Sequence, residues 1–435
     1  MIKRVLITIA LLYLIAIGFG TWGYAVHKWQ IFPYSIIHGI QVEISGALTE
    51  AQKKSAADIL TTHHQERRNH FDYAGFVRRD QTFRDPGYLL ISGFSRTHGQ
   101  VVVDLVRLNP FERLHQWIPP VREILSRGKK NAAVPGLHLT EAGFRVQHPL
   151  LLGDGSLVFG HGEGYLARID KNNKLLWVNS HHFHHSIEMD AKGRLVTAIN
   201  ISPPALGYSK QWRDDGYAIL SVDGKILEIR SVGRILRDNG YEGLFRAYGY
   251  LKPEDRLHLN DIQPVDTTKG IVKQGDLALS LRNPSTVALY RPSTNTITAF
   301  RTGPWLLQHD INRLADGRFS VFNNFLNKAL PNVSGPISTM MIWDPETGAV
   351  ESPYESIMKK ARVHTNGSGR GRILPNGDAF IEETERDRML RVSREKVRWE
   401  YVNAPETRPD ISGALHWSRY YLPAEIPLAW LKETS

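Results

Sequence analysis

Two histidines occupy equivalent places in two segments that match each other residue by residue. His309 lies eight residues before Gly317, and His185 lies eight residues before Gly193. A neutral imidazole can attack an electrophile or carry a proton near pH 7, because its reference pKa is about 6.5. Histidines at equivalent positions of a repeat therefore indicate one site in which several imidazoles face one another.

A third segment fits the same motif with a longer turn. The stretch Asn260-Asp261-Ile262 matches the histidine motif, His258 lies two residues upstream, and Arg282 ends the strand predicted after it. A guanidinium stays protonated and can donate two parallel hydrogen bonds to one anion. Taken singly, Arg282 could be a surface arginine and Asn260 a turn residue. They belong to the predicted site only if the fold brings them close to the histidines.

The tract His181–His185 contains four histidines and invites comparison with a metal site. Successive residues of a strand point to opposite faces, so only part of the tract can face one point. A few histidines alone make an incomplete zinc site. The chain also has no His-Glu-x-x-His motif, no Walker loop and no Gly-x-Ser-x-Gly motif. The sequence therefore predicts neither a metal nor a cofactor.

A repeat of short strands must position these residues. Six units each begin with a glycine and a hydrophobic strand, at residues 87, 155, 193, 275, 317 and 377, with spacings of 38 to 82 residues. Recurring small antiparallel sheets are typical of a β-propeller, whereas a β-sandwich needs no such unit. We therefore predict an all-β, six-bladed β-propeller over residues 86–435. Its innermost strands would bring His185, His258, Arg282 and His309 to one channel mouth, within about 10 Å of a common point.

Composition supports a folded body without naming a partner. Hydrophobic residues make up 42% of the 435 residues and charged residues 23%, which excludes an extended disordered chain. The net charge is 54 − 44 = +10 and is not focused in a basic block, so no nucleic-acid partner is predicted. The chain has no cysteine. This excludes disulfides, thiolate metal sites and cysteine nucleophiles.

The N-terminus carries an apolar run that is long enough to cross a membrane. Lys3-Arg4 precedes the run 5–26, whose 22 residues would span roughly 33 Å as a helix. We predict a transmembrane signal anchor over residues 1–30, with a cleaved signal peptide as the rival interpretation. Residues 31–85 would form a juxtamembrane segment. The propeller would then lie on the periplasmic or extracytoplasmic side of the cell membrane, held by a single pass.

Several motifs together resemble the bacterial arylsulfotransferases, in the same order, over residues 145–402. The motifs are His184-His185, His258-Leu259-Asn260 with a strand ending in Leu281-Arg282, Gln308-His309-Asp310, and Gly371–Asp378 continuing to Arg398–Tyr401. Members of that family are six-bladed propellers that move a sulfuryl group from an aryl sulfate to a phenol without a nucleotide sulfate donor. Two departures are Ser186, where Asp is common, and Asn323-Asn324, where Asp-Asn is frequent.

The resemblance implies a role for each candidate residue. His309 would be the transiently sulfated nucleophile, with His185, His258, Asn260 and Arg282 around the sulfuryl group. Sulfuryl transfer needs donors for the peripheral oxygens and an acid for the leaving phenolate, as phosphoryl transfer does. Arg282, His258 and Asn260 would supply the donors, and a protonated His185 the acid.

The sequence thus predicts a membrane-anchored sulfotransferase that acts on a small aryl sulfate and a phenol. Two alternatives remain open at this stage. One is a non-catalytic propeller that kept the fold and binds a ligand or partner. The other is an enzyme of different chemistry in the same channel.

Overall fold

The computed structural model describes residues 65–128, 141, 143–205, 213–246, 254–325, 337–365, 367–405 and 407–433. The anchor predicted for residues 1–30, and the juxtamembrane segment up to residue 64, lie outside them. Contacts divide the chain into residues 1–60 and 61–435, and the second unit is the one described below. No helix within the described ranges is both long and apolar enough to cross a bilayer.

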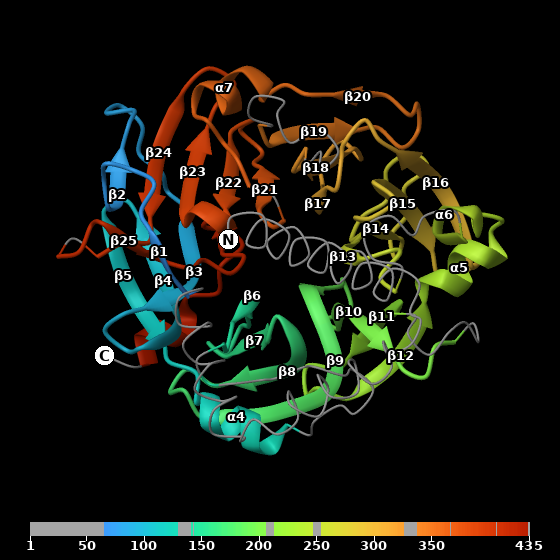
Figure 1. Cartoon of the computed structure of the whole chain (residues 1–435), viewed down its shortest axis with the longest axis horizontal. Helices are drawn as coiled ribbons and strands as arrows, with labels where there is room; N and C mark the ends of the chain where they lie inside the picture. Colours follow the sequence, from blue (N-terminus) through green and yellow to red (C-terminus); the bar gives the residue numbers. More distant parts are fainter. Residues whose placement is uncertain are drawn as a thin grey trace, which may run out of the picture. The chain divides into compact units, whose positions relative to one another are not determined.

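Antiparallel sheets arranged around a common centre make up this unit (Figure 1). One sheet has the order β26 (Arg419–Tyr421), β3 (Tyr88–Ser95), β4 (Gln100–Leu108) and β5 (Phe111–Trp117). Another has β13 (Leu259–Pro264), β14 (Leu277–Leu281), β15 (Thr286–Arg291) and β16 (Thr296–Thr302). The next has β17 (His309–Arg313), β18 (Phe319–Asn323), β19 (Thr339–Trp343) and β20 (Val350–Glu351).

Two larger sheets and one small sheet complete the described strands. The five-stranded sheet has the order β2 (Gly75–Arg78), β24 (Val397–Val402), β23 (Arg388–Val392), β22 (Ala379–Glu383) and β21 (Arg370–Ile373). The seven-stranded sheet runs through β12 (Ile226–Ser231), β11 (Asp214–Leu220), β10 (Leu195–Ile201), β9 (Leu175–Met189), β8 (Glu163–Ile169), β7 (Leu157–Gly160) and β6 (Gln147–Leu151). The small sheet pairs β1 (Glu66–Arg68) with β25 (Ile411–Gly413).

Short helices lie in the connections between these strands. They are α4 (Val121–Arg127), α5 (Val232–Asp238), α6 (Gly243–Arg246), α7 (Glu355–Lys360) and the 3₁₀ turns η1 (Thr384–Arg386) and η2 (Ala429–Glu433).

The predicted all-β, propeller-like class is confirmed, whereas the predicted count of six blades is not. The described strands form five sheets of four or more strands, because β9 runs unbroken for 15 residues. The N-terminal half of β9 pairs with β8, for example Ala167 with Val178. Its C-terminal half pairs with β10, for example Thr197 with Ile187. One continuous strand therefore joins two stretches that the sequence presents as separate units.

Strands from the two ends of this unit complete sheets formed by distant segments. Strand β2 pairs with β24, with Phe76 opposite Tyr401, and β26 pairs with β3, with Tyr420 opposite Leu89. Residues 65–85, which the sequence analysis assigned to the juxtamembrane segment, thus contribute β1 and β2 to the sheets. The local pattern could not reveal this, because each pairing joins residues more than 300 positions apart.

Five of the six glycines of the repeat, at residues 155, 193, 275, 317 and 377, lie in the turn between the first and second strands of a unit, whereas Gly87 directly precedes β3. Gly193 and Gly317 have φ values of 71° and 95°, a left-handed conformation that favours glycine. Asp190 Oδ1 accepts hydrogen bonds from the backbone N–H groups of Lys192 and Arg194 and closes the first of these turns. The strand that carries each histidine therefore precedes the glycine and is the first strand of its unit.

Adjacent sheets are held together by apolar side chains. Val287 and Leu289 of β15 belong to one buried cluster with Ile311, Val321 and Trp343 of the following sheet. Burying one such side chain contributes about 1.5–3 kcal/mol. The first strands also contact one another, β9 with β13, β13 with β17 and β17 with β21. This packing holds the strands that carry the candidate residues in fixed positions.

Candidate active site

Three of the predicted histidines meet at the ends of three neighbouring first strands. The ring centroids of His185 and His258 are 4.9 Å apart, and those of His185 and His309 are 6.5 Å apart. Both distances fall inside the span that the sequence analysis expected. His185 lies in β9, His258 directly precedes β13, and His309 is the first residue of β17.

The other two predicted residues are connected to the same group. The backbone N–H of Arg282 donates to the carbonyl oxygen of His258 at 3.0 Å. Asn260 Nδ2 donates to the carbonyl oxygen of Gln308 at 2.7 Å, directly before His309. The structure thus brings all five residues together, while their roles in chemistry remain predictions.

Backbone irregularities turn these side chains at the strand ends. The pairing of β9 with β10 shifts register next to His185, and the pairing of β17 with β18 shifts next to His309. His185 and His258 also have positive φ values of 58° and 52°. Bulges of this kind bend a strand and redirect a side chain, and they are frequent beside active sites.

His309 is held in one tautomer by Asn324. Its Nδ1 lies 2.7 Å from Asn324 Oδ1. Asn324 Nδ2 donates to the carbonyl oxygens of Thr365 at 3.0 Å and Ser368 at 2.6 Å. Because the amide nitrogen is engaged by two acceptors, the amide oxygen must face the imidazole and accept its Nδ1–H. The lone pair of His309 therefore lies on Nε2.

The Nε2 atom of His309 is the ring nitrogen that Asn324 leaves free. It is buried and has no hydrogen-bond partner within the described residues. Burial, together with the positive charge of Arg282, holds the pKa of His309 well below its usual range. A neutral imidazole with an unshared lone pair on Nε2 is the form that a nucleophile requires.

His258 has a different partner from His309. Its Nδ1 lies 2.6 Å from Asp255 Oδ2, and Asp255 is only 4% exposed. The carboxylate orients the ring and leaves Nε2 as the nitrogen opposite this bond. A buried carboxylate on one side of an imidazole stabilises the ring when it takes up a proton.

His185 is buried among other imidazoles. Its Nδ1 lies 3.0 Å from His184 Nδ1, and His184 Nε2 lies 3.4 Å from Asp215 Oδ1. Burial, with the positive charge that the neighbouring histidines carry when protonated, holds the pKa of His185 well below its usual range. These surroundings disfavour the charged ring and therefore do not favour His185 as the acid for the leaving oxygen, although that role stays a prediction.

Arg282 presents a largely uncommitted guanidinium to this site. Its Nη1 donates to Asn283 Oδ1 at 2.9 Å, and its Nε is buried without a partner in the described part of the chain. No ion pair engages Arg282 among the described residues. Burial lowers the pKa of Arg282, yet a guanidinium remains protonated at any physiological pH. A half-buried cation of this kind suits an anionic ligand.

Asn260 and Gln308 brace the strand that begins with the candidate nucleophile. Asn260 Nδ2 is committed to the Gln308 carbonyl, and the buried Asn260 Oδ1 has no partner in the described part. Gln308 Nε2 lies within hydrogen-bond distance of Ser280 Oγ, the Leu281 carbonyl and the Thr286 carbonyl, at 3.2, 3.1 and 3.0 Å. The main observed role of Asn260 is thus to position this strand.

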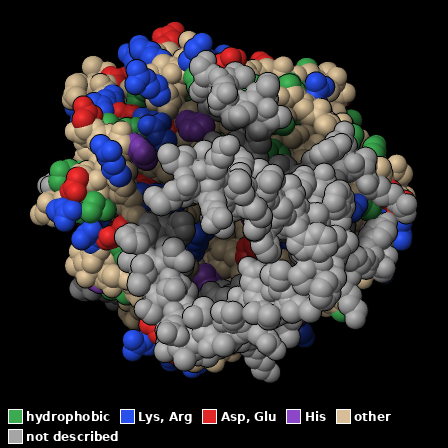
Figure 2. Space-filling view, viewed as in Figure 1, with side chains coloured by type: hydrophobic (Ala, Val, Ile, Leu, Met, Phe, Trp, Pro, Cys, Tyr) green, Lys and Arg blue, Asp and Glu red, His purple; other side chains and the backbone are tan. Residues whose placement is uncertain are grey.

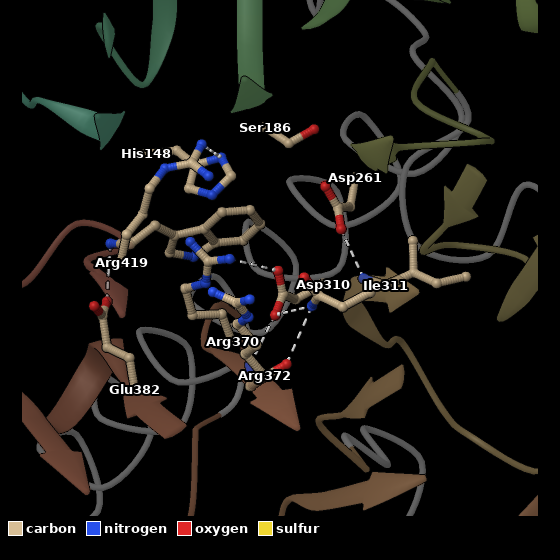
Figure 3. A network of polar contacts seen from close by, with 12 residues as sticks. His148, Ser186, Asp261, Asp310, Ile311, Arg370, Arg372, Glu382 and Arg419 are labelled. Carbon is tan, nitrogen blue, oxygen red and sulfur yellow. Dashed lines mark hydrogen bonds and ion pairs between the residues drawn. The ribbon is translucent and has the colours of Figure 1, made fainter. Parts of the chain in front are cut away.

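Side chains that follow the site positions connect one first strand to the next. Each accepts a hydrogen bond from a backbone N–H of the neighbouring sheet, and Figure 3 shows the bond between Asp261 and Ile311 as a dashed line. The pairs are Ser186 Oγ with Ile262 at 3.0 Å, Asp261 Oδ2 with Ile311 at 2.6 Å, and Asp310 Oδ2 with Gly371 at 2.8 Å. Asp310 of the Gln-His-Asp motif therefore connects two sheets. Ser186 does the same with a hydroxyl, which explains how the chain accommodates this departure from the family pattern.

A buried charge network surrounds these connections. Asp310 Oδ1 lies 3.3 Å from Arg370 Nη2 (Figure 3), and Arg419 Nη1 lies 3.1 Å from Glu188 Oε2. Burial, together with the negative charges of Asp310 and Glu188, raises the pKa of Asp261 to about 8. On the face seen in Figure 2, histidine atoms lie next to basic side chains. At the site itself, the positive charge of Arg282 acts on His309 and favours an anionic substrate.

Sequence reasoning missed three residues that complete the site. The Trp417 ring lies 6.0 Å from the His185 ring and 6.1 Å from the His309 ring, and its Nε1 is buried without a partner in the described ranges. Trp417 follows the last repeat unit, so no repeat marks it. Asn324 was noticed only as a variant position. Asp255 precedes His258 by three residues, and this spacing was the one available signal.

The family model described as arylsulfotransferase (ASST) matches residues 148–404, which is more than half of the chain. The chain belongs to the arylsulfotransferase family. The match includes all five predicted site residues as well as Asn324 and Asp255, but it ends before Trp417. No curated protein matches the chain significantly.

Three solved structures show remote similarity to the chain. A Bacteroides caccae protein of unknown function is 12% identical, with 78% of this chain and 99% of that chain covered and a TM-score of 0.46. The virginiamycin B lyase of Staphylococcus aureus is 11% identical, with 80% and 99% covered and a TM-score of 0.39. The Pan2 WD40 domain of Neurospora crassa is 8% identical, with 78% and 86% covered and a TM-score of 0.40.

Proposed function

We propose that this arylsulfotransferase-family protein moves a sulfuryl group from an aryl sulfate to a phenol through a sulfated His309. One observation carries the proposal. His309 is fixed by Asn324 as the Nδ1–H tautomer, which leaves a lone pair on Nε2, next to the cation of Arg282, that no other described residue engages.

In the first half-reaction, Nε2 of His309 attacks the sulfur of the aryl sulfate. An N–S bond forms, the S–O bond to the ring breaks, and the phenolate leaves with the bonding electrons and takes up a proton. In the second, the oxygen of a phenol attacks the same sulfur and loses its proton, the N–S bond breaks, and Nε2 regains its lone pair. No redox change or cofactor is required.

The surroundings of His309 fit the charges that develop in these steps. Positive charge grows on the ring as Nε2 attacks, and Asn324 Oδ1 accepts the Nδ1–H at 2.7 Å and stabilises that charge. The transition state is loose and carries negative charge on the peripheral sulfuryl oxygens. The Arg282 guanidinium can donate to two of those oxygens.

We also propose that the seven-stranded sheet corresponds to two blades that share β9, which would restore the six blades expected from the sequence. Support comes from the two partners of β9, because β8 pairs with residues between Leu175 and His184 and β10 pairs with residues between Phe183 and Met189.

The N-terminal anchor remains part of the proposal. Lys3-Arg4 and the apolar run 5–26 support a single membrane crossing with the propeller outside the cytoplasm. A reporter that is active only after export, fused to the C-terminus, should be active in cells. An inactive reporter whose fusion protein is expressed would contradict this topology.

The activity is tested with the full-length protein in detergent and the chromogenic donor 4-nitrophenyl sulfate, with and without phenol as acceptor. The proposal expects phenol-dependent release of nitrophenol, formation of phenyl sulfate and ping-pong kinetics. A folded protein that binds the donor but never releases nitrophenol would refute the proposal and favour a binding propeller.

A further inference from the structure

Two site histidines have chemically different partners, although both rings flank His185. His309 Nδ1 faces a neutral amide at 2.7 Å, whereas His258 Nδ1 faces the Asp255 carboxylate at 2.6 Å. Two titratable groups in one site take different roles when their surroundings favour different charge states. A carboxylate favours an imidazole that gains a proton, and an amide does not.

Asp255 is itself held in place from behind. Arg213 Nε lies 3.8 Å from Asp255 Oδ1, and the same guanidinium contacts Asp215 Oδ1 at 3.0 Å and Glu163 Oε1 at 2.9 Å. Asp255 is 4% exposed. A buried carboxylate is tolerated when charge and hydrogen bonds compensate its desolvation, and Arg213 with His258 supply both. This support fixes the direction from which the carboxylate meets the ring.

The proposed sulfuryl transfer needs a proton carrier. The leaving phenolate must gain a proton in the first half-reaction, and the incoming phenol must lose one in the second. The Nδ1 of His185 faces another imidazole, that of His184 at 3.0 Å, and the lone pair of His309 is used for attack. Among the three histidines that meet at this site, only His258 has a carboxylate on its Nδ1.

We propose that Asp255 is a positioning residue that makes His258 the proton carrier of both half-reactions. With Nδ1–H donated to Asp255, the second proton of His258 moves from Nε2 to the phenolate oxygen as the S–O bond breaks. In the return step, the phenol proton moves to Nε2 as the phenol oxygen attacks sulfur. Proton and charge are balanced over the cycle. This inference rests on the proposed function.

The need for an acid depends on the leaving group, and this separates a proton carrier from a structural role. An acidic nitrophenol leaves readily as the anion, whereas unsubstituted phenol, with a pKa of about 10 like that of tyrosine, needs protonation. We therefore compare kcat/KM for 4-nitrophenyl sulfate and phenyl sulfate in the full-length protein. For Asp255→Asn, the loss should be less than about tenfold with the nitrophenyl donor and about 10²–10⁴-fold with phenyl sulfate.

A matched control tests whether the larger loss with phenyl sulfate arises merely from removing a carboxylate partner of Arg213. Glu163→Gln removes another carboxylate from the same guanidinium, and the Glu163 side chain contacts none of the three site histidines in the described structure. It should leave the ratio of the two kcat/KM values unchanged. In a His258→Gln background, adding Asp255→Asn should not lower kcat/KM for phenyl sulfate any further relative to 4-nitrophenyl sulfate, because Asp255 acts through His258.

The possible outcomes separate the two proposals. If Asp255→Asn lowers kcat/KM by the same factor for both donors, the positioning role is overturned, while the proposed sulfotransferase activity stands. A further selective loss in the double variant would also overturn it. If the wild type transfers no sulfuryl group to any acceptor, the proposed function fails, and this inference fails with it.

Discussion

Replacing Asn324 with alanine tests how His309 is prepared for attack. The substitution removes the acceptor of the His309 Nδ1–H at 2.7 Å, and it also takes a donor from the carbonyl oxygens of Thr365 and Ser368. The imidazole is then no longer held with its lone pair on Nε2. A hydrogen bond to a group that gains charge contributes about 1.5–3 kcal/mol. The expected fall in kcat/KM is therefore about 10- to 150-fold.

The assay is the initial rate of nitrophenol release from 4-nitrophenyl sulfate, with thermal unfolding measured in parallel. Asn323→Ala is a closely matched control. Asn323 is also buried and also makes three hydrogen bonds, to Leu306 N, Phe325 N and Thr339 Oγ1. Each variant should lose about 3 kcal/mol of stability at about 1 kcal/mol per bond. Only Asn324→Ala should lose activity in addition.

Equal activity in the two variants would refute the reasoning. Wild-type kcat/KM in Asn324→Ala, with reduced stability, would show that the bond supports the fold and does not select the reactive tautomer.

Three further predictions concern the neighbours of the nucleophile. Arg282→Lys keeps the charge but loses the two-pronged geometry, so kcat should fall about 10²–10³-fold in the transfer assay, and a smaller change would argue against contact with the sulfuryl oxygens. Ser186→Ala removes one of the two acceptors of the Ile262 N–H and leaves Asp261 Oδ1 at 2.9 Å, so calorimetry should show a loss of about 1 kcal/mol while kcat/KM stays within a few-fold. Burial raises the pKa of Asp261 to about 8 from an ordinary 3.8, so folding favours its protonated form, and its contribution to stability falls as pH rises between these values. Asp261→Asn should therefore flatten the decline in melting temperature between pH 5 and pH 8, and an unchanged slope would contradict the assignment.

The sequence predicted the parts of the site that local patterns encode. Strand alternation and turn glycines such as Gly193 made the repeat visible, and the repeat placed His185 and His309 at equivalent strand ends. Convergence then followed from the fold class, because the first strands of neighbouring sheets contact one another. These inferences needed only residues close together in the chain.

The parts that sequence reasoning missed depend on contacts through space. Asn324 follows β18, and its meaning appears only when its amide meets the carbonyls of Thr365 and Ser368. Trp417 reaches the site because β26 pairs with β3 from the other end of the unit. The continuity of β9 was also missed, since the sequence presents the two stretches that this strand joins as separate repeat units.

Ser186 shows how a family pattern can be read too strictly. It seemed to weaken the resemblance because aspartate is common at that position. In the structure, Ser186 Oγ accepts the Ile262 N–H just as Asp261 accepts the Ile311 N–H. The position requires a short acceptor that connects two sheets, and a hydroxyl meets that requirement as well as a carboxylate.

The central claim is that His309 carries the sulfuryl group. The most direct measurement mixes the full-length protein with 4-nitrophenyl sulfate without acceptor, quenches within milliseconds at alkaline pH, and locates any added mass by peptide mapping. We predict one sulfuryl adduct on the peptide that contains His309, its loss after phenol is added, and no adduct on His309→Asn. Turnover of the wild type without an adduct, or turnover of His309→Asn at the wild-type rate, would contradict the account.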